Sequence, residues 1–231
     1  MQMPNTYRPG FGLVAVLLMA LAGCPRVDVV DEPAPQPAET DTPDDPAAPD
    51  PGTLDPPDPE PEEPPPPTIP TVSLTESLRA TCLVFVDDPF PEGDLTDVDG
   101  TEHSMHDVLG PELTVVVFWN RGNVHSVFQL EDLARDFAEP LADRGGRIVA
   151  INVGDTPEDA AEAAREANAE FLVLLDPDRA YFGKVATEGL PRTYVLDADG
   201  TILWFDLEYS RSTRRLLEQT IDAALSDEPA P

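Results

Sequence analysis

The sequence predicts an α/β fold in which helices flank a mixed central sheet on both faces. Short apolar runs of strand type alternate with segments of helical periodicity between residues 83 and 225. Such alternation indicates parallel strands joined by crossover helices. The alternation ends in a predicted hairpin and a terminal helix, and a hairpin adds antiparallel strands to the sheet.

The first half of the domain contains two runs that read as strands, at 83–86 and 113–118. Residues 95–102 lie between them and predict a hairpin that turns at Asp99-Gly100, because an Asp-Gly pair suits the backbone of a tight turn. Strands of this length and apolar content are typical of a sheet whose faces are both covered.

Helix and strand patterns alternate after the second run. Apolar residues recur at three- and four-residue steps from Val127 to Leu141, which predicts an amphipathic helix with an interruption near Pro140. A strand is expected at 147–153. The Ala- and Glu-rich segment 157–168 follows as a helix, with Thr156 as its N-cap and a proline at the first helical position.

The last part of the domain closes the predicted sheet. Two of its strands surround Asp199-Gly200 and therefore predict a second hairpin. The expected elements in chain order are a strand at 171–175, a short helix at 176–186, strands at 193–196 and 202–205, and a helix at 212–225.

The first residues have the pattern of an export signal. Arg8 precedes an apolar run from Phe11 to Ala22, which is too short for a membrane-spanning helix and ends in Leu21-Ala22-Gly23-Cys24. This segment resembles a bacterial lipoprotein signal. The resemblance implies that residues 1–23 are removed and that acylated Cys24 anchors the protein in a membrane of the bacterial cell envelope. Pro25 replaces the Asp associated with inner-membrane retention, which favours the outer membrane.

Residues 24–72 are predicted to be a disordered tether. The stretch from Pro25 to Pro70 holds 17 of the 28 prolines of the chain and 13 acidic residues against a single base, Arg26. Proline removes backbone donors, like charges repel, and little apolar area is available to offset chain entropy. One globular domain at 73–226 and a disordered tail at 227–231 complete the expected organisation.

Net charge excludes one class of partner. The chain carries 45 acidic and 14 basic residues, a net charge of -31, so the phosphate backbone of a nucleic acid would repel it. We expect no cofactor and no metal. His103 and His106 are three residues apart but are interpreted as unrelated exposed side chains.

Four segments between about Asp94 and Leu225 resemble the thioredoxin-like redoxin group, in particular its alkyl hydroperoxide reductase/thiol-specific antioxidant branch and the TlpA-like membrane-tethered disulfide reductases. They are the hairpin 95–100, the strand 114–119, the strand and turn 171–178, and the sequence Gly189-Leu190-Pro191-Arg192-Thr193-Tyr194-Val195-Leu196-Asp197-Ala198-Asp199-Gly200. The resemblance implies a thioredoxin-like fold and a cis-proline at Pro191 that faces the active-site loop.

The Cys-x-x-Cys motif of this group is degenerate in the chain. Alignment on Phe118-Trp119 puts Asn123 where the attacking cysteine belongs and Ser126 where the resolving cysteine belongs. Disulfide exchange needs a thiolate and proceeds through a mixed disulfide, so conventional oxidoreductase activity is not expected and we assign no catalytic residue here. Asn123 instead predicts an N-cap that accepts from the N–H of His125 or Ser126.

We therefore predict a membrane-tethered module that binds an envelope protein or peptide in a groove. The expected groove residues are Trp119, Arg121, Asn123, His125, Ser126, Leu190 and Pro191. One alternative is a thiol-disulfide oxidoreductase or peroxidase that acts through Cys82 and a thiol of the partner. Another is an inert structural module. Cys82 lies in an apolar run and is expected to be buried.

Overall fold

The computed structural model describes residues 67–226. The predicted signal peptide, the acylation site Cys24, most of the predicted tether and the tail at 227–231 lie outside the described residues. Within 67–226, no helix has the length and apolar character needed to cross a membrane.

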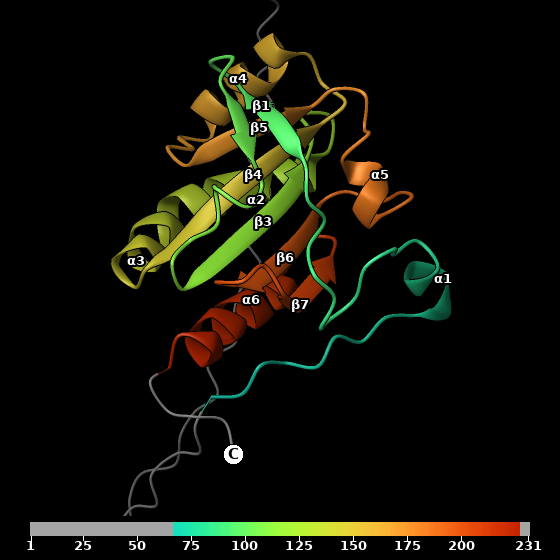
Figure 1. Ribbon diagram of the computed structural model, residues 1–231, viewed down its shortest axis with the longest axis vertical. Helices are drawn as coiled ribbons and strands as arrows, with labels where there is room; N and C mark the ends of the chain where they lie inside the picture. The colour runs from blue at the N-terminus through green and yellow to red at the C-terminus, as the bar shows by residue number, and fades with distance from the viewer. Residues whose placement is uncertain (1–66, 227–231) are drawn as a thin grey trace, which may run out of the picture. The chain divides into compact units, whose positions relative to one another are not determined.

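A seven-stranded sheet forms the centre of the domain, with the strand order β2-β1-β5-β4-β3-β6-β7 (Figure 1). Strands β3, β4 and β5 are parallel, whereas the other neighbours pair antiparallel. The predicted mixed sheet is therefore confirmed. The strands are β1 (Asp94–Asp97), β2 (Glu102–Ser104), β3 (Leu113–Trp119), β4 (Gly146–Val153), β5 (Leu172–Asp176), β6 (Arg192–Asp197) and β7 (Ile202–Leu207).

Helical segments lie on both faces of the sheet (Figure 1). They are α1 (Glu76–Arg79), α2 (Val124–Asp132), the π-helix η1 (Leu133–Phe137), α3 (Ala138–Asp143), α4 (Pro157–Glu166), α5 (Phe182–Val185) and α6 (Arg211–Ala224). Helices α2 to α4 and α6 contribute side chains to one core, and α5 with the segment before β1 contributes to the other.

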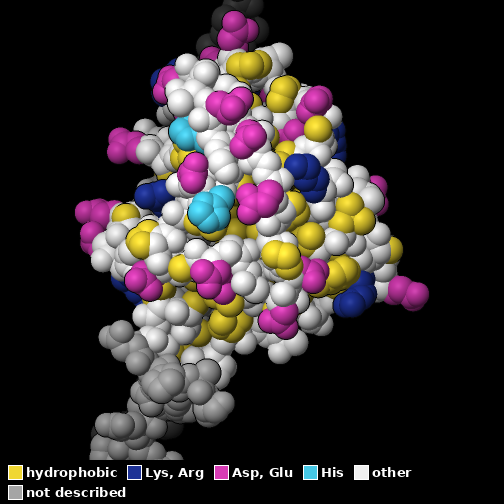
Figure 2. Space-filling model, viewed as in Figure 1, with side chains coloured by type: hydrophobic (Ala, Val, Ile, Leu, Met, Phe, Trp, Pro, Cys, Tyr) yellow, Lys and Arg dark blue, Asp and Glu magenta, His cyan; other side chains and the backbone are white. Residues whose placement is uncertain are grey.

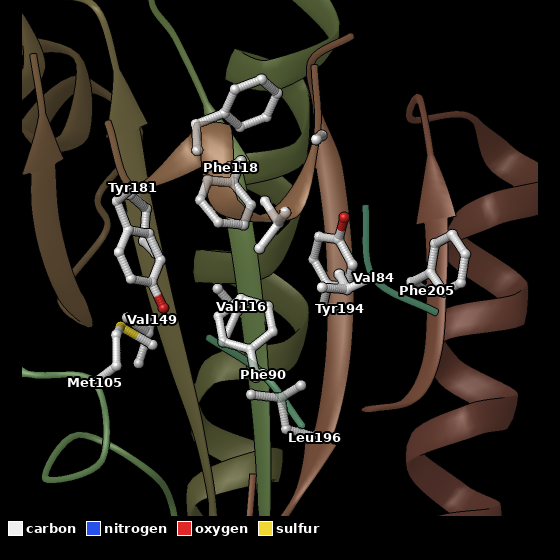
Figure 3. Packing of buried hydrophobic residues seen from close by; sticks show 14 of the residues in the cluster. Val84, Phe90, Met105, Val116, Phe118, Val149, Tyr181, Tyr194, Leu196 and Phe205 are labelled. Carbon is white, nitrogen blue, oxygen red and sulfur yellow. The ribbon is translucent and has the colours of Figure 1, made fainter. Parts of the chain in front are cut away.

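The central strand β3 is buried along its whole length and supplies both cores. Val115 and Val117 face the core under α2, while Val116 and Phe118 face the core under α5. This second core is rich in aromatic rings, as Figure 3 shows for Phe118 and its neighbours. The ring of Phe118 meets that of Tyr194 edge to face, with 5.9 Å between centroids, a geometry that adds to the energy of burial.

Both predicted hairpins form and share one turn chemistry. The carboxylate of Asp97 accepts hydrogen bonds from the N–H groups of Asp99 at 2.9 Å and Thr101 at 2.8 Å. Asp197 repeats this arrangement in the second hairpin, at 3.0 and 2.8 Å. The glycine of each turn has a positive φ, 86° for Gly100, which favours glycine at that position. The repeated Asp-x-Asp-Gly-Thr sequence therefore fixes two turns by local bonds.

The predicted strand at 83–86 is wrong. Cys82 makes a single antiparallel bridge to Ala186, and no ladder follows it. The carboxylate of Asp88 accepts a hydrogen bond from the N–H of Phe85 at 2.8 Å. This side chain closes a turn and takes a backbone donor that a strand would use, so the apolar run ends in irregular structure.

The interruption expected near Pro140 lies earlier in the chain. Pro140 occupies the first turn of α3, and the π-helix η1 directly precedes that helix. Proline has no N–H, so the carbonyl of Asp136, four residues before it, lacks its α-helical donor. A π-helical turn is one way for a chain to accommodate such a break.

The helix expected at 176–186 is much shorter. Only Phe182–Val185 is helical. The carboxylate of Asp176 accepts hydrogen bonds from the N–H groups of Tyr181 at 3.1 Å and Phe182 at 2.7 Å, and Arg179 has a φ of 62°. The positive φ is incompatible with a right-handed helix, so residues 177–181 form turns that Asp176 organises.

Candidate functional site

The loop after β3 leads into α2 at Asn123, which caps the helix as predicted. Its side-chain oxygen accepts hydrogen bonds from the N–H groups of His125 at 2.9 Å and Ser126 at 3.3 Å. Two backbone donors that the helix itself leaves unpaired are satisfied in this way. The position of the missing nucleophile therefore has a structural role at the start of α2.

Asn123 also connects α2 to the loop before β6. Its side-chain amide donates a hydrogen bond to the carbonyl oxygen of Leu190 at 2.7 Å. The peptide bond between Leu190 and Pro191 is cis, which confirms the predicted cis-proline. Every hydrogen-bonding group of the Asn123 side chain except one amide hydrogen is thus engaged within the domain.

Two predicted groove residues are buried beneath this surface. Trp119 and Ser126 are each 0% exposed. Among the described residues, neither the Trp119 indole nitrogen nor the Ser126 hydroxyl has a hydrogen-bond partner. Gln129, one turn after Ser126, is also buried and donates to the Thr193 hydroxyl at 2.6 Å. Trp119 and Ser126 therefore support the surface from below.

Arg121 is directed toward α4. Its guanidinium pairs with Asp159 at 3.0 Å and Glu162 at 2.6 Å, and its backbone N–H donates to the carboxylate of Asp155 at 2.7 Å. The hydrogen bond and negative charge of Glu162 raise the pKa of Arg121. The positive charge of Arg121, which was expected to face a ligand, is therefore neutralised by carboxylates of the same domain.

The exposed part of the site is the outer face of α2. Val124 is 56% exposed and Phe128 is 52% exposed, one helical turn apart. We call these two residues the α2 patch. His125 is exposed beside them, Leu190 is half-buried and Pro191 is buried. Sequence reasoning missed the α2 patch because it followed only the apolar stripe from Val127 to Leu141, to which neither Val124 nor Phe128 was assigned.

The signal that would have revealed the α2 patch is a reversal of the helical pattern. In the first two turns of α2, polar Ser126 and Gln129 face the core, whereas Val124 and Phe128 face outward. A helix that packs on a sheet ordinarily places its apolar residues inward. The polar residues Ser126 and Gln129, placed where apolar ones are expected, therefore indicate an exposed apolar surface on α2. The apolar stripe that continues from Leu130 does not indicate one.

Cys82 is buried, at 7% exposure, as predicted. Its thiol donates to the carbonyl of Leu78 at 3.5 Å, and the guanidinium of Arg192 donates to its sulfur at 3.4 Å. Arg192 directly follows Pro191 and is itself 1% exposed. Burial also raises the pKa of the neighbouring Tyr194 to about 12. This cluster lies in the core under α5.

His103 and His106, which were considered as metal ligands, have different surroundings in the structure. The prediction that both are exposed is confirmed for His106 and wrong for His103. His103 is half-buried and hydrogen-bonds the carboxylate of Asp97 at 2.7 Å, which lowers the pKa of Asp97. No group of three or more His, Cys, Asp or Glu side chains suited to a metal is found within residues 67–226.

Two hollows lie away from the α2 patch. One of about 530 Å³ is bounded by the segment 69–74, Phe85 and Phe205. Another of about 490 Å³ is bounded by His103, Arg147 and Phe171. No residue of the predicted groove lines either hollow, so neither coincides with that groove.

A carboxyl on β7 gives a testable pH effect. Burial raises the pKa of Asp206 to about 6, although its carboxylate accepts from the N–H of Leu207 at 2.7 Å. A raised pKa means that folding disfavours the charged form, so Asp206 destabilises the protein above pH 6 and this cost disappears as pH falls toward 4. We expect Asp206→Asn to raise the free energy of unfolding by about 1–2 kcal/mol near pH 7.5.

Urea denaturation of the purified protein at pH 7.5 and pH 4 measures this difference, which should be close to zero at the lower pH. Asp107→Asn is the matched control, because the Asp107 side chain is 80% exposed. A gain of the same size at both pH values would contradict the assignment of the effect to Asp206 ionisation.

The comparisons with known proteins agree with this fold. The model of the AhpC/TSA family matches residues 86–205. No curated protein matches the chain in sequence. A putative thiol:disulfide interchange protein DsbE from Chlorobium tepidum is 23% identical with a TM-score of 0.55, covering 62% of this chain and 99% of that structure.

Two further solved structures are similar. A putative protein disulfide isomerase from Bacteroides thetaiotaomicron is 18% identical, with a TM-score of 0.58 and coverage of 63% of this chain and 92% of that one. An uncharacterised conserved protein from Geobacillus kaustophilus is 24% identical, with a TM-score of 0.51 and coverage of 64% and 89%. At these identities the likeness establishes the fold alone. Because the family model spans more than half of the chain, from before β1 into β7, the chain belongs to the AhpC/TSA family and its domain has the thioredoxin-like fold.

Proposed function

We propose that this domain is a protein- or peptide-binding module of the bacterial cell envelope, held at a membrane by acylated Cys24. The observation that carries the proposal is the double role of Asn123. This side chain occupies the nucleophile position, caps α2 and bonds to the loop before β6. The site is thus organised as a rigid surface.

The chemistry of the replaced residues supports a role in binding. Thiol-disulfide exchange requires a thiolate that attacks a disulfide and forms a mixed disulfide. Neither the amide of Asn123 nor the hydroxyl of Ser126 forms such a bond. The hydroxyl of Ser126 is also buried, so it is not available to a substrate from solution.

The exposed residues of the site suit a macromolecular partner. The α2 patch presents two apolar side chains to solvent, with His125 between them in sequence. Exposed apolar side chains that lie together favour association because water is released when they are covered. His125 and Leu190 would lie at the margin of such a contact.

A second candidate function, redox chemistry through Cys82, has one observation in its favour: the guanidinium of Arg192 lies 3.4 Å from the sulfur. The sulfur is nevertheless in a residue that is 7% exposed. A reacting thiol must be accessible to its substrate. The segment that carries Cys82 would have to open before the thiol met a partner.

Insulin reduction by dithiothreitol tests the two candidates. We expect the purified protein and its Cys82→Ser variant to leave the rate at the uncatalysed background, because the one cysteine within residues 67–226, Cys82, is buried. Peroxide consumption should likewise be unchanged. Reductase or peroxidase activity that disappears in Cys82→Ser would establish the redox function and overturn the binding proposal.

Site-specific photocrosslinking in the membrane tests binding directly. A photoreactive amino acid at position 125 should yield a discrete covalent adduct with one envelope protein. The same amino acid at position 139, an exposed site on α3, should not. Absence of any adduct at position 125, or identical adducts at both positions, would contradict a binding surface at α2.

A further inference from the structure

The backbone carbonyls of the loop before β6 accept hydrogen bonds from the domain itself. Arg192 donates from Nε to the carbonyls of Glu188 and Gly189, each at 3.1 Å. Asn123 donates to the carbonyl of Leu190 at 2.7 Å. The next carbonyl, of Pro191, accepts from the N–H of Glu208 at 3.0 Å.

This arrangement disfavours recognition of an extended peptide by strand pairing. A peptide that adds a strand to a protein needs free backbone acceptors and donors along the segment that it joins. Four consecutive carbonyls, from Glu188 to Pro191, already have partners, and proline supplies no N–H. A partner at this site must therefore be recognised mainly through side chains.

The side chains that remain available are those of the α2 patch. Val124 and Phe128 are more than half exposed, and both belong to one face of a regular helix that is anchored at its start by Asn123. A fixed helix face loses little conformational entropy when a partner covers it. The α2 patch is thus suited to packing against apolar side chains of another protein.

The charged residues near the α2 patch indicate which charge a partner should carry around its apolar side chains. Glu131 lies three residues beyond Phe128, on the same side of α2, and Glu188 is exposed in the neighbouring loop. The positive charge of Arg121 is neutralised by Asp159 and Glu162. The net charge of the chain is -31. Acidic side chains also predominate over basic ones on the face of the domain seen in Figure 2, where the sheet lies in front of α2.

We propose that the partner is a basic protein surface with large apolar side chains at its centre, which packs on the α2 patch and does not pair with the loop backbone. This inference rests on the proposed binding function and specifies the partner class. Electrostatic complementarity would accelerate encounter and select against acidic envelope proteins, while the apolar contact would supply most of the binding energy.

Two synthetic peptides of equal charge serve as probes. One is a Leu/Lys peptide with helical periodicity, and the other is an alternating Val/Lys peptide that favours an extended strand. Fluorescence anisotropy measures the affinity of the purified full chain for each. We expect the helical peptide to bind more tightly, with an affinity that falls as salt is added.

Phe128→Ser should weaken binding of the helical peptide about tenfold, which corresponds to about 1.4 kcal/mol. Leu83→Ser is the matched control, because Leu83 is 50% exposed on another segment, and it should leave the affinity unchanged. Equal losses in both variants, or tighter binding of the extended peptide, would overturn the inference.

The crosslinking experiment separates this inference from the function on which it rests. If the adduct at position 125 forms equally well in the Phe128→Ser protein, the domain binds a partner but the α2 patch does not hold it. If no adduct forms and neither peptide discriminates Phe128→Ser from Leu83→Ser, the binding function fails together with the inference. Circular dichroism should show that both variants are folded.

Discussion

The double variant Asn123→Cys/Ser126→Cys is expected to reduce insulin with dithiothreitol as electron donor, a reaction that the unaltered protein should not accelerate. The expected effect is large because the fold around the two positions is retained. β3 leads into the loop, α2 begins at residue 124, and the loop with the cis Leu190–Pro191 bond faces the start of the helix.

The physical reason lies in the backbone donors at the start of α2. The N–H groups of His125 and Ser126 now point at the side-chain oxygen of Asn123, at 2.9 and 3.3 Å. A thiolate at position 123 would receive these donors and the positive end of the helix dipole. A fall in thiol pKa from about 8.5 to about 7 would raise the thiolate fraction at pH 7 about fifteenfold.

The second substitution removes an unfavourable group. The Ser126 hydroxyl is buried without a hydrogen-bond partner among the described residues, and a thiol is tolerated there because it is a weak donor. Loss of the Asn123 cap should cost about 1 kcal/mol of stability. The double variant should therefore remain folded, with a moderate reduction in its free energy of unfolding.

The single variants are the controls. Ser126→Cys places one thiol in a buried position and should be inactive, while Asn123→Cys should form mixed disulfides that turn over slowly for want of a resolving thiol. A double variant that is folded, forms the disulfide and still fails to reduce insulin would show that the surface has diverged beyond the loss of two sulfur atoms.

Local sequence determined much of the fold. The Asp-x-Asp-Gly-Thr turns, the Thr156 cap of α4 and the Asn123 cap of α2 were predictable because each uses partners within four residues. The apolar run of β3 likewise identified the central strand, since both of its faces are buried. These elements are specified by short spacings that a single sequence displays.

Elements that depend on distant partners were not predictable. The run 83–86 has strand-like composition, yet the N–H of Leu83 bonds to the carbonyl of Val185, and Cys82 makes only a single bridge to Ala186. In the site, the bond of Asn123 to Leu190 spans 67 residues and that of Arg121 to Glu162 spans 41. The residues around one position do not predict such pairings, because the pairings depend on the order of strands in the sheet and on the packing of α4.

The exposed apolar residues of α2 were not identified from the sequence. The predicted stripe is buried at Leu130 and Leu133, but β6 also presents the polar Thr193 to the underside of α2. Gln129 is drawn inward by its hydrogen bond to that hydroxyl. This bond favours the rotation of α2 that leaves Val124 and Phe128 outside. Polar side chains in the core thus determine which apolar ones reach solvent.

The largest expected loss of stability follows from removing Arg192, which connects the Cys82 segment to the loop before β6. Its guanidinium is 1% exposed and donates to the carbonyls of Glu188 and Gly189, to the Thr81 hydroxyl at 2.5 Å and to the Cys82 sulfur. Arg192→Met retains much of the volume but leaves the buried Cys82 sulfur and three partly buried oxygens without their donor. A buried acceptor left without a donor costs about 1–3 kcal/mol.

We therefore expect Arg192→Met to lower the free energy of unfolding by about 3 kcal/mol or more, measured by urea denaturation. Arg215→Met makes the same chemical change at an exposed position on α6 and should shift stability by less than about 0.5 kcal/mol. Arg192→Lys should recover only part of the loss, because one ammonium group cannot reach acceptors on both segments.

Alkylation of Cys82 distinguishes loss of this connection from a general loss of stability. If Arg192 holds residues 81–82 against the loop, Arg192→Met should accelerate reaction of the Cys82 thiol with iodoacetamide more than a core variant of equal stability does, for example Leu217→Ala in α6. Local opening near Arg192 exposes the thiol without global unfolding. Equal alkylation rates in the two variants would show that Arg192 stabilises the domain as a whole and does not specifically hold the segment that buries Cys82.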